Sequence, residues 1–375
     1  MMRNRILAAV AVATVATTAL AGCSSSSPSS GSGGSSSSAG SNASSNNKVG
    51  ILLPDTTSSP RWVSADPSEL QKECGVYKLD CKVYNANGSA STQEQQNQQL
   101  ISWGAGVILE VDLDSASGSQ IEKLDESKGV VPIDYDRLTQ GGGAAYYVSY
   151  DNVKVGEDQG TALTQCPQVA GKTSVGYVEI DGASTDTNAT LFAQGYNSVL
   201  SKTSGWTELN DGNGAWSAQT AQTVFQQQLG KYGSKINAVM VANDTMAQSV
   251  INVLAQQGLS KQVAVSGQDA SPGGLDNIMS GTQCFSIYKP VAGEADVAVK
   301  LASQILAGQK PTAPATITDP STGRAVPSYL ATPVVITKAN VALPVTQGYE
   351  TAKSVCSTST AIAALCNANG IKYTG

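Results

Sequence analysis

Polar side chains follow most of the predicted strands of this chain, at the point where each strand ends. In an open parallel sheet, ligands bind beyond the carboxyl ends of the strands. The residues at these ends are cations, carboxylates, amides and a tryptophan: Arg61-Trp62, Asp136-Arg137, Asp186, Asn188, Asn243, Gln268-Asp269 and Lys289. Carboxylates accept hydrogen bonds from hydroxyls, Arg, Lys and Asn donate them, and an indole covers the C–H face of a ring. This mixture indicates a neutral polyol as the ligand.

The composition excludes several classes of function. The chain has no histidine, which rules out Ser-His-Asp and Cys-His hydrolases and most zinc enzymes. Gly171-Lys172-Thr173 resembles the end of a phosphate-binding loop, but Cys166 stands where that motif requires glycine. The net charge is −6 and the basic residues are scattered, so no nucleic acid partner is expected. We expect a protein that is not an enzyme, with no cofactor and no metal; a glycosidase with two carboxylates is the catalytic alternative.

Short apolar runs alternate with longer amphipathic stretches from residue 48 onward. Strands are predicted at 49–54, 82–85, 107–111, 130–135, 174–180, 238–242 and 263–267, with strand-like crossings near 145–150 and 284–288. This rhythm is typical of parallel sheets with helices on both faces. We therefore expect an α/β fold of two doubly wound parallel-sheet lobes joined by a hinge. Asp181 and Asp244 are expected to cap helices.

The first 47 residues are predicted to serve targeting and tethering. Residues 1–22 have the features of a signal peptide, because Arg3 and Arg5 precede an apolar run that is too short to span a membrane. The junction that ends in Cys23 resembles the lipobox of bacterial lipoproteins, in which the cysteine carries the lipid. Residues 23–47 would then be the lipidated Cys23 and a Ser-rich flexible tether. We expect an extracytoplasmic protein that meets the membrane through this anchor only; a plain secretory signal is the alternative.

The six cysteines other than Cys23 suit an oxidising compartment. Six cysteines allow 15 pairings. The spacings favour one set, because Cys74 and Cys81 bracket a short turn and Cys356 and Cys366 lie together near the C-terminus. Cys166 and Cys284 remain as the third pair. The alternative is that some of these cysteines, above all the third pair, are buried free thiols.

Several motifs together resemble the type I periplasmic sugar-binding proteins of ABC importers, in particular their xylose-binding branch and its multi-sugar relatives. The motifs are Arg61-Trp62, Tyr135-Asp136-Arg137-Leu138, residues 147–156, Gly267-Gln268-Asp269-Ala270 and Tyr288-Lys289-Pro290. The resemblance covers about residues 49–370. It implies a monomeric binding protein whose partners are a monosaccharide ligand, D-xylose first, and the permease of an importer.

The resemblance also implies roles for particular residues. Arg61, Asp136 and Arg137 would contact the sugar from the N-terminal lobe, with Trp62 shaping the pocket. From the C-terminal lobe or the hinge, the contacts would come from Asn188, Trp216, Asn243, Asp269 and Lys289. Two departures concern ligand choice: Asp186-Thr187-Asn188 replaces the family's Asp-Asn-Asn, and Ser217, not proline, follows Trp216.

The expected domains follow the same resemblance. Residues 48–150 would form the N-terminal lobe, completed by about 290–325, and residues 151–289 the C-terminal lobe, completed by about 326–375. A multi-sugar binding protein that serves as the sensor subunit of a membrane receptor is the alternative function. A sugar-responsive DNA-binding regulator would need a helix-turn-helix where residues 1–47 hold a signal and a tether.

Overall fold

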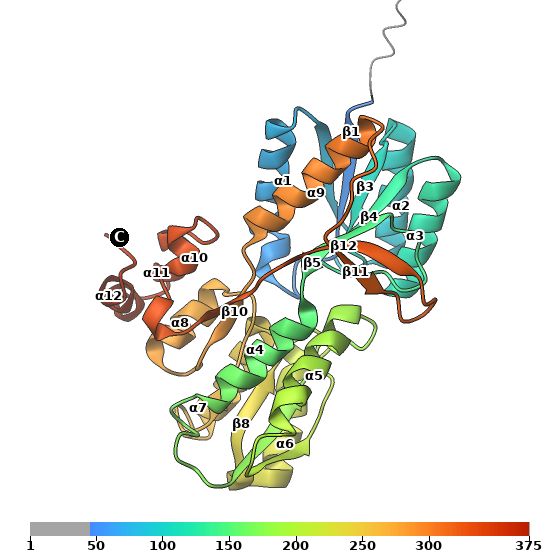
Figure 1. The fold of residues 1–375 in the computed structure, drawn as a ribbon. Coiled ribbons are helices and arrows are strands. Elements are labelled where there is room, and N and C mark those ends of the chain that lie inside the picture. Colours follow the sequence, from blue (N-terminus) through green and yellow to red (C-terminus); the bar gives the residue numbers. More distant parts are fainter. Residues whose placement is uncertain (1–45, 375) are drawn as a thin grey trace, which may run out of the picture. The chain divides into compact units, whose positions relative to one another are not determined.

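The computed structural model describes residues 46–374, so the predicted signal peptide and Cys23 lie outside the described residues. In the described part of the chain, the first lobe contains a seven-stranded sheet in the order β11-β12-β5-β4-β3-β1-β2 (Figure 1). Its strands are β1 (Lys48–Leu53), β2 (Asp80–Asn85), β3 (Val107–Glu110), β4 (Val131–Tyr135), β5 (Tyr146–Tyr150), β11 (Ala315–Thr318) and β12 (Ala325–Ala331). Only the β11–β12 pair is antiparallel among these neighbours.

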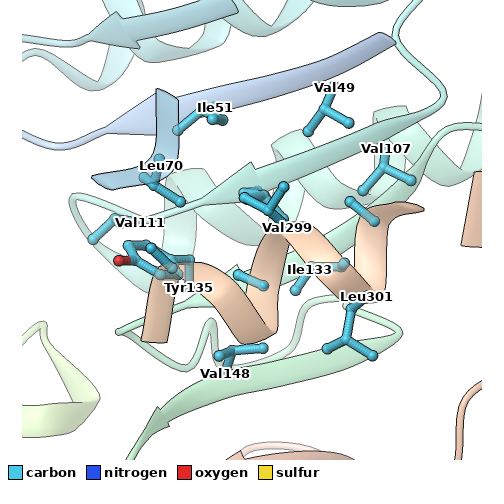
Figure 2. Packing of buried hydrophobic residues seen from close by; sticks show 14 of the residues in the cluster. Val49, Ile51, Leu70, Val107, Val111, Ile133, Tyr135, Val148, Val299 and Leu301 are labelled. Carbon is cyan, nitrogen blue, oxygen red and sulfur yellow. The ribbon is translucent and has the colours of Figure 1, made fainter. Parts of the chain in front are cut away.

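Helices cover both faces of this sheet. They are η1 (Pro60–Trp62), α1 (Ala65–Val76), α2 (Ala90–Trp103), α3 (Ser115–Ser127) and α9 (Val291–Leu306). Figure 2 shows Val49 and Ile51 of β1 packed with Leu70 of α1 and Val299 of α9 on one face. Leu52 of the same strand packs with Leu100 of α2 on the other face. Because both faces are buried, the strand reads as a continuous apolar run instead of an alternating one.

The second lobe is built around a four-stranded parallel sheet, within residues 46–374, in the order β7-β6-β8-β9. Its strands are β6 (Val175–Ile180), β7 (Trp206–Asn210), β8 (Ile236–Val241) and β9 (Ala264–Val265). Its helices are α4 (Asn152–Thr164), α5 (Thr187–Leu200), α6 (Ala218–Tyr232), α7 (Asp244–Gln256) and α8 (Pro272–Ser280), with a short η2 (Gly233–Lys235). Helices α4 and α5 lie very close: a Cβ on Gly156 would come within 2.1 Å of the Phe192 carbonyl oxygen. Glycine is therefore required there.

Two further strands and a helical C-terminal segment complete this lobe. Strands β10 (Ser286–Tyr288) and β13 (Val334–Ile336) pair antiparallel. The C-terminal segment, defined here as residues 338–374, contains η3 (Lys338–Asn340), α10 (Leu343–Thr346), α11 (Ala352–Cys356) and α12 (Thr360–Ala368). Its apolar side chains pack on those of α8, and Figure 1 shows α10, α11 and α12 beside α8.

The described chain passes between the lobes three times, after β5, after β10 and after β12. The last crossing differs from the expected boundary near residue 325. Ser328 to Ala331 of β12 pair with β5 in the first sheet, so the first lobe extends to residue 331. Hydrogen bonding to β5, which the local sequence does not show, sets this boundary.

The three predicted cysteine pairs are the three disulfides of residues 46–374. Cys74–Cys81 and Cys356–Cys366 each close a short loop, and Cys166–Cys284 joins residues 118 positions apart. The Cα atoms of the pairs are 6.2, 6.0 and 5.9 Å apart respectively. None of the helices in this part of the chain is long and apolar enough to cross a membrane.

Candidate ligand-binding site

A small pocket lies between the two lobes, where strands of both sheets end. The first lobe contributes Ser58, Ser59, Trp62, Asp136 and Arg137. The second lobe and the crossing after β10 contribute Asp186, Asn188, Phe192, Trp216, Asn243, Gln268, Asp269 and Lys289. Eight of the nine predicted site residues therefore line one pocket, and Arg61 does not.

Asp136 is the most highly connected carboxylate of the pocket. Arg61 Nη1 donates to its Oδ2 at 2.6 Å, Asn188 Nδ2 donates to its Oδ1 at 3.1 Å, and Lys289 Nζ lies 3.6 Å away. Burial disfavours the charge, but Lys289, Arg61 and Arg137 outweigh burial and hold the pKa of Asp136 below its usual value. The side chain is therefore ionised and can only accept hydrogen bonds.

The backbone of Asp136 explains why this side chain reaches the pocket. Its φ of 65° lies in the left-handed region, which residues other than glycine adopt only when the surroundings impose it. The N–H donates to the Val148 carbonyl at 2.8 Å, and the carbonyl accepts from Ser149 Oγ at 2.6 Å and from Asn188 Nδ2 at 2.9 Å. These contacts turn the chain sharply at the end of β4.

Arg61 lies behind Asp136, away from the pocket. Its guanidinium donates to Asp66 at 2.6 and 2.8 Å and to Glu294 at 2.8 Å, as well as to Asp136. Burial opposes its charge, but Asp66, Asp136 and Glu294 outweigh burial and raise the pKa of Arg61. In this structure the buried carboxylates of α1 and α9 hold the guanidinium, and a direct sugar contact by Arg61 stays a prediction. The motif Arg61-Trp62 alone does not show those partners.

Lys289 brings the two lobes' carboxylates together. Its Nζ lies 3.6 Å from Asp136 Oδ2 in the first lobe and 3.4 Å from Asp269 Oδ1 in the second. All three side chains are buried. One ammonium group therefore faces an acceptor from each side of the pocket.

Four buried polar atoms of the pocket residues have no hydrogen-bond partner among the described residues. They are Ser59 Oγ, Trp62 Nε1, Gln268 Oε1 and Asp269 Oδ1. Buried polar atoms are nearly always paired in folded proteins, by protein, water or ligand. These four include a donor, two acceptors and a hydroxyl that can act as either. They suit a ligand whose own groups both donate and accept.

Direct polar contacts join the two lobes around the pocket. Asn243 Nδ2 donates to the Ser58 carbonyl at 2.8 Å, and Arg137 Nε lies 3.1 Å from Asp186 Oδ2. Next to them, Thr187 Oγ1 donates to the Leu138 carbonyl at 2.9 Å. The lobes are therefore closed on each other in this structure.

Trp216 forms one wall of the pocket. Its Nε1 donates to Asp186 Oδ2 at 3.0 Å, and its ring meets the edge of Phe192 with centroids 6.4 Å apart. A Cβ on Gly182 would lie 2.0 Å from a ring atom of Trp216, so the ring requires glycine there. Asp186 follows a predicted strand and is found from the sequence, but Phe192 lies inside α5 with no local signal that it lines a pocket.

Neither of the two predicted helix caps is a cap. Asn243 caps α7, since its side chain accepts from the Met246 N–H. Asp244 is buried and accepts from Gln283 Nε2 at 2.7 Å, Ser286 Oγ at 3.0 Å and the Ser271 N–H at 2.9 Å. Burial raises the pKa of Asp244 to about 7. The pattern Asn-Asp at a strand end does not reveal which residue begins the helix.

Asp181 likewise serves a different purpose. Its carboxylate accepts a hydrogen bond from the Tyr196 hydroxyl, and burial raises its pKa to about 6. The cap of α5 is Asp186.

Within residues 46–374, no cluster of three or more acidic or cysteine side chains is arranged to hold a metal ion.

The chain matches a family model described as periplasmic binding protein domain over residues 49–310. It is 33% identical over 305 residues to the D-xylose-binding periplasmic protein of Escherichia coli, with 78% of this chain and 88% of that protein covered. The D-xylose-binding periplasmic protein of Haemophilus influenzae is 29% identical over 324 residues, with 83% and 93% covered. A multiple sugar-binding periplasmic receptor of Rhizobium radiobacter is 27% identical over 316 residues, with 80% and 88% covered.

Solved structures of solute-binding proteins resemble the fold. A carbohydrate transporter solute binding protein from Chloroflexus aurantiacus, in complex with D-glucose, gives a TM-score of 0.74 at 24% identity, with 82% of this chain and 97% of that chain covered. The Caulobacter myo-inositol binding protein, bound to myo-inositol, gives 0.69 at 22% identity, with 82% and 98% covered. At these identities the likeness concerns the fold, and it confirms the predicted class of two doubly wound lobes.

Proposed function

This chain belongs to the type I periplasmic sugar-binding proteins, in the branch of the D-xylose-binding proteins, and we propose that it captures a free monosaccharide, namely D-xylose, between its lobes for delivery to an ABC importer. The family consists of solute-binding proteins and not of enzymes. Its relatives named for D-xylose are the reason for placing this pentose first.

The observation that carries the proposal is the set of pocket atoms that have no hydrogen-bond partner among the described residues. Trp62 Nε1 can donate, Gln268 Oε1 and Asp269 Oδ1 can accept, and Ser59 Oγ can do either. Each hydroxyl of a sugar donates one hydrogen bond and accepts others, so a neutral polyol satisfies both kinds of atom. A phosphate or carboxylate ligand would leave the acceptors Asp136 and Asp269 facing its own negative oxygens.

The two lobes supply complementary halves of the proposed site. Asp136 of the first lobe and Asp269 of the second each present a carboxylate, with Lys289 between them. The indoles of Trp62 and Trp216 line the same pocket, and an indole is a side chain that can cover the C–H groups of a pyranose. A sugar held from both sides would make binding and lobe closure one equilibrium.

We further propose that the protein is a monomeric, extracytoplasmic lipoprotein anchored at Cys23. This part rests on the sequence, since residues 1–45 lie outside the structure described. The disulfides support an oxidising compartment. The tether of residues 24–47 would keep the binding domain near its permease.

The test is isothermal titration calorimetry of the purified protein with D-xylose, D-glucose, D-galactose, L-arabinose and D-ribose. We expect saturable one-to-one binding, strongest with D-xylose. Incubation with a nitrophenyl β-D-xyloside should release no nitrophenol, which separates binding from glycoside hydrolysis. Absence of binding by all five sugars would contradict the proposal.

A multi-sugar receptor subunit is the second candidate. One reason is the similarity to the multiple sugar-binding receptor. Another is the segment Asp186-Thr187-Asn188, which departs from the family's Asp-Asn-Asn and in which Thr187 donates a hydrogen bond to the Leu138 carbonyl of the other lobe. Comparable affinities for three or more of the five sugars would support it. Deleting the gene separates the roles: an importer subunit is needed for xylose uptake, whereas a sensor subunit is needed for the response to the sugar.

A further inference from the structure

Asp269 and Ala270 form a turn whose backbone lies in the left-handed region. Their φ angles are 92° and 48°, which residues other than glycine keep only when neighbouring groups impose them. The Asp269 N–H donates to the Ile287 carbonyl at 2.7 Å, and the Ala270 N–H donates to Ser286 Oγ at 2.9 Å. The carbonyl of Asp269 accepts from the Tyr349 hydroxyl at 2.8 Å.

Tyr349 reaches this turn from the C-terminal segment. Its ring also packs against Tyr288, with centroids 5.0 Å apart and planes tilted by 55°. Tyr288 directly precedes Lys289, whose Nζ lies 3.4 Å from Asp269 Oδ1. Tyr349 therefore contacts the backbone of Asp269 and the ring of Tyr288, which precedes Lys289, the ion-pair partner of Asp269.

The hydroxyl of Tyr349 is a permanent donor in this position. Burial, followed by the nearby Asp269 carboxylate, raises the pKa of Tyr349 well above its usual value. Its proton is therefore retained over the whole physiological pH range.

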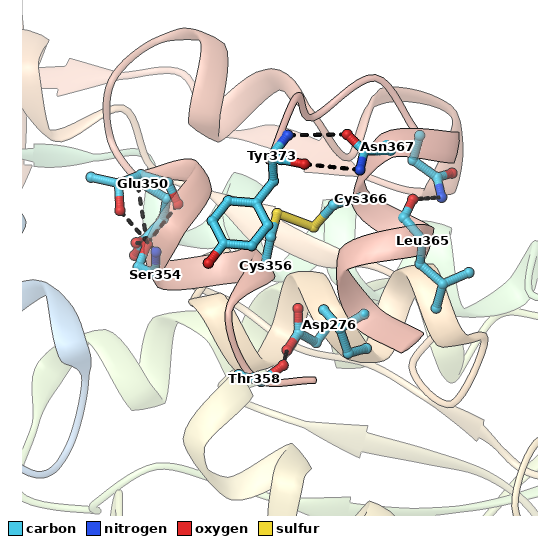
Figure 3. Close-up of a disulfide and its surroundings, with 12 residues drawn as sticks. Asp276, Glu350, Ser354, Cys356, Thr358, Leu365, Cys366, Asn367 and Tyr373 are labelled. Carbon is cyan, nitrogen blue, oxygen red and sulfur yellow. Dashed lines mark hydrogen bonds between the residues drawn. A yellow bond between two sulfur atoms is a disulfide. The ribbon is translucent and has the colours of Figure 1, made fainter. Parts of the chain in front are cut away.

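The C-terminal segment is itself fastened to the second lobe. The disulfide Cys356–Cys366 joins α11 to α12, and Thr358 Oγ1 donates to Asp276 Oδ2 of α8 at 3.0 Å (Figure 3). Helix α8 begins at Pro272, directly after the Asp269 turn, with Ser271 as its cap. Segment, helix and turn are thus packed as one unit.

We infer that the C-terminal segment is a positioning arm of the ligand site, in which the Tyr349 hydroxyl fixes the turn that aims the Asp269 carboxylate into the pocket. This inference rests on the proposed function, because it assumes that Asp269 accepts from the ligand. Without the hydroxyl, the Asp269 carbonyl loses the contact, and the turn can relax toward a less demanding conformation. Asp269 then spends less time in the orientation that serves the ligand.

The experiment compares Tyr349→Phe with Tyr373→Phe, both folded and both titrated with D-xylose by calorimetry. Phenylalanine keeps the ring contact with Tyr288 and removes only the hydroxyl. Tyr373 comes from the same segment and apolar cluster but pairs through its backbone with Asn367, so it is the matched control. We expect about a tenfold loss of affinity for Tyr349→Phe and less than a twofold loss for Tyr373→Phe.

A double-mutant cycle with Asp269→Asn separates positioning from general loosening of the lobe. If Tyr349 acts through Asp269, removing its hydroxyl in the Asp269→Asn background should weaken binding less than twofold, with NMR titration used for weak binding. Equal affinity of Tyr349→Phe and wild type, or fully additive losses in the cycle, would overturn the inference. Wild-type protein that binds none of the sugars would instead overturn the proposed function.

Discussion

Replacing Asp136 by asparagine tests the centre of the proposed site with the smallest change in shape. The two carboxylate oxygens accept from different donors, Oδ2 from Arg61 and Oδ1 from Asn188. An asparagine has only one acceptor oxygen. Whichever way its amide turns, one of these donors faces an NH₂ group, and the negative charge between Arg61 and Lys289 is lost.

The size of the effect follows from what is left unpaired. Truncating one partner of a buried, hydrogen-bonded charge pair typically costs about 2–5 kcal/mol of binding free energy. We expect a loss of about 2–4 kcal/mol, which is roughly a 30- to 1000-fold weaker affinity for D-xylose. Arg61 keeps Asp66 and Glu294 as partners, so the fold should survive with a smaller loss of stability, about 1–3 kcal/mol.

The assay is calorimetry with D-xylose on wild type, Asp136→Asn and a matched Asp-to-Asn control, Asp151→Asn. Asp151 is exposed and caps α4 by accepting from the Lys154 N–H at 3.0 Å. Asparagine caps helices as well as aspartate does, so the control should bind within about twofold of wild type. Circular dichroism must show that all three proteins are folded. A folded Asp136→Asn protein with near-native affinity would mean that this pocket is not the binding site.

Three further predictions concern stability and location. Burial raises the pKa of Glu179 to about 8 and of Asp112 and Asp125 to about 7, so these groups bind more protons when folded than when unfolded between pH 5 and 8. The free energy of unfolding, measured by urea titration, should therefore fall as pH rises through this window. Glu179→Gln should make this pH dependence less steep. An unfolding free energy that rises with pH would refute the reasoning. Replacing Cys166 and Cys284 by alanine should lower the free energy of unfolding by about 5 kcal/mol in the chain-entropy model, against about 2–3 kcal/mol for Cys74 and Cys81, because the first bridge closes 118 residues and the second seven; equal losses would contradict that account. Cys23→Ser should move the protein from the membrane fraction to the medium, and a mutant that stays in carbonate-washed membranes would exclude lipid anchoring at this residue.

Most residues that line the candidate pocket could be predicted from the sequence, because strand ends are a local feature. Asp136, Asn243 and Lys289 each follow an apolar run, and the geometry of parallel sheets brings such ends to one edge. The contacts that these residues make with distant parts of the chain could not be predicted in this way. Phe192 enters the pocket from inside a helix, and Glu294 reaches Arg61 across 233 residues of chain, so no short window contains the contact.

Two of the strands that the sequence did not predict, β7 and β12, lack a continuous buried apolar run. Strand β7 is an edge strand whose Thr207 and Glu208 are exposed, so it lacks the signal that marked its neighbours. Strand β12 contains Pro327 and pairs with β5, a segment far away in the chain. Such pairing depends on the tertiary fold and overrides local propensity.

The same residues hold the lobes together and line the candidate pocket, so lobe closure and the proposed binding depend on the same side chains. Asn243 lines the pocket and donates a hydrogen bond to the Ser58 carbonyl in the other lobe. Asn188 also lines the pocket and donates a hydrogen bond to Asp136 in the other lobe. The neutral bond of Asn243 contributes only about 0.5–1.5 kcal/mol net, because water replaces it in the open form, and the bond of Asn188 to the Asp136 carboxylate contributes about 1.5–3 kcal/mol. These contacts should favour closure by a few kcal/mol, and the hydrogen bonds of a bound sugar would add to that preference. A substitution at Asn188 would consequently change ligand affinity and the closed population together, and no mutation there can isolate one from the other.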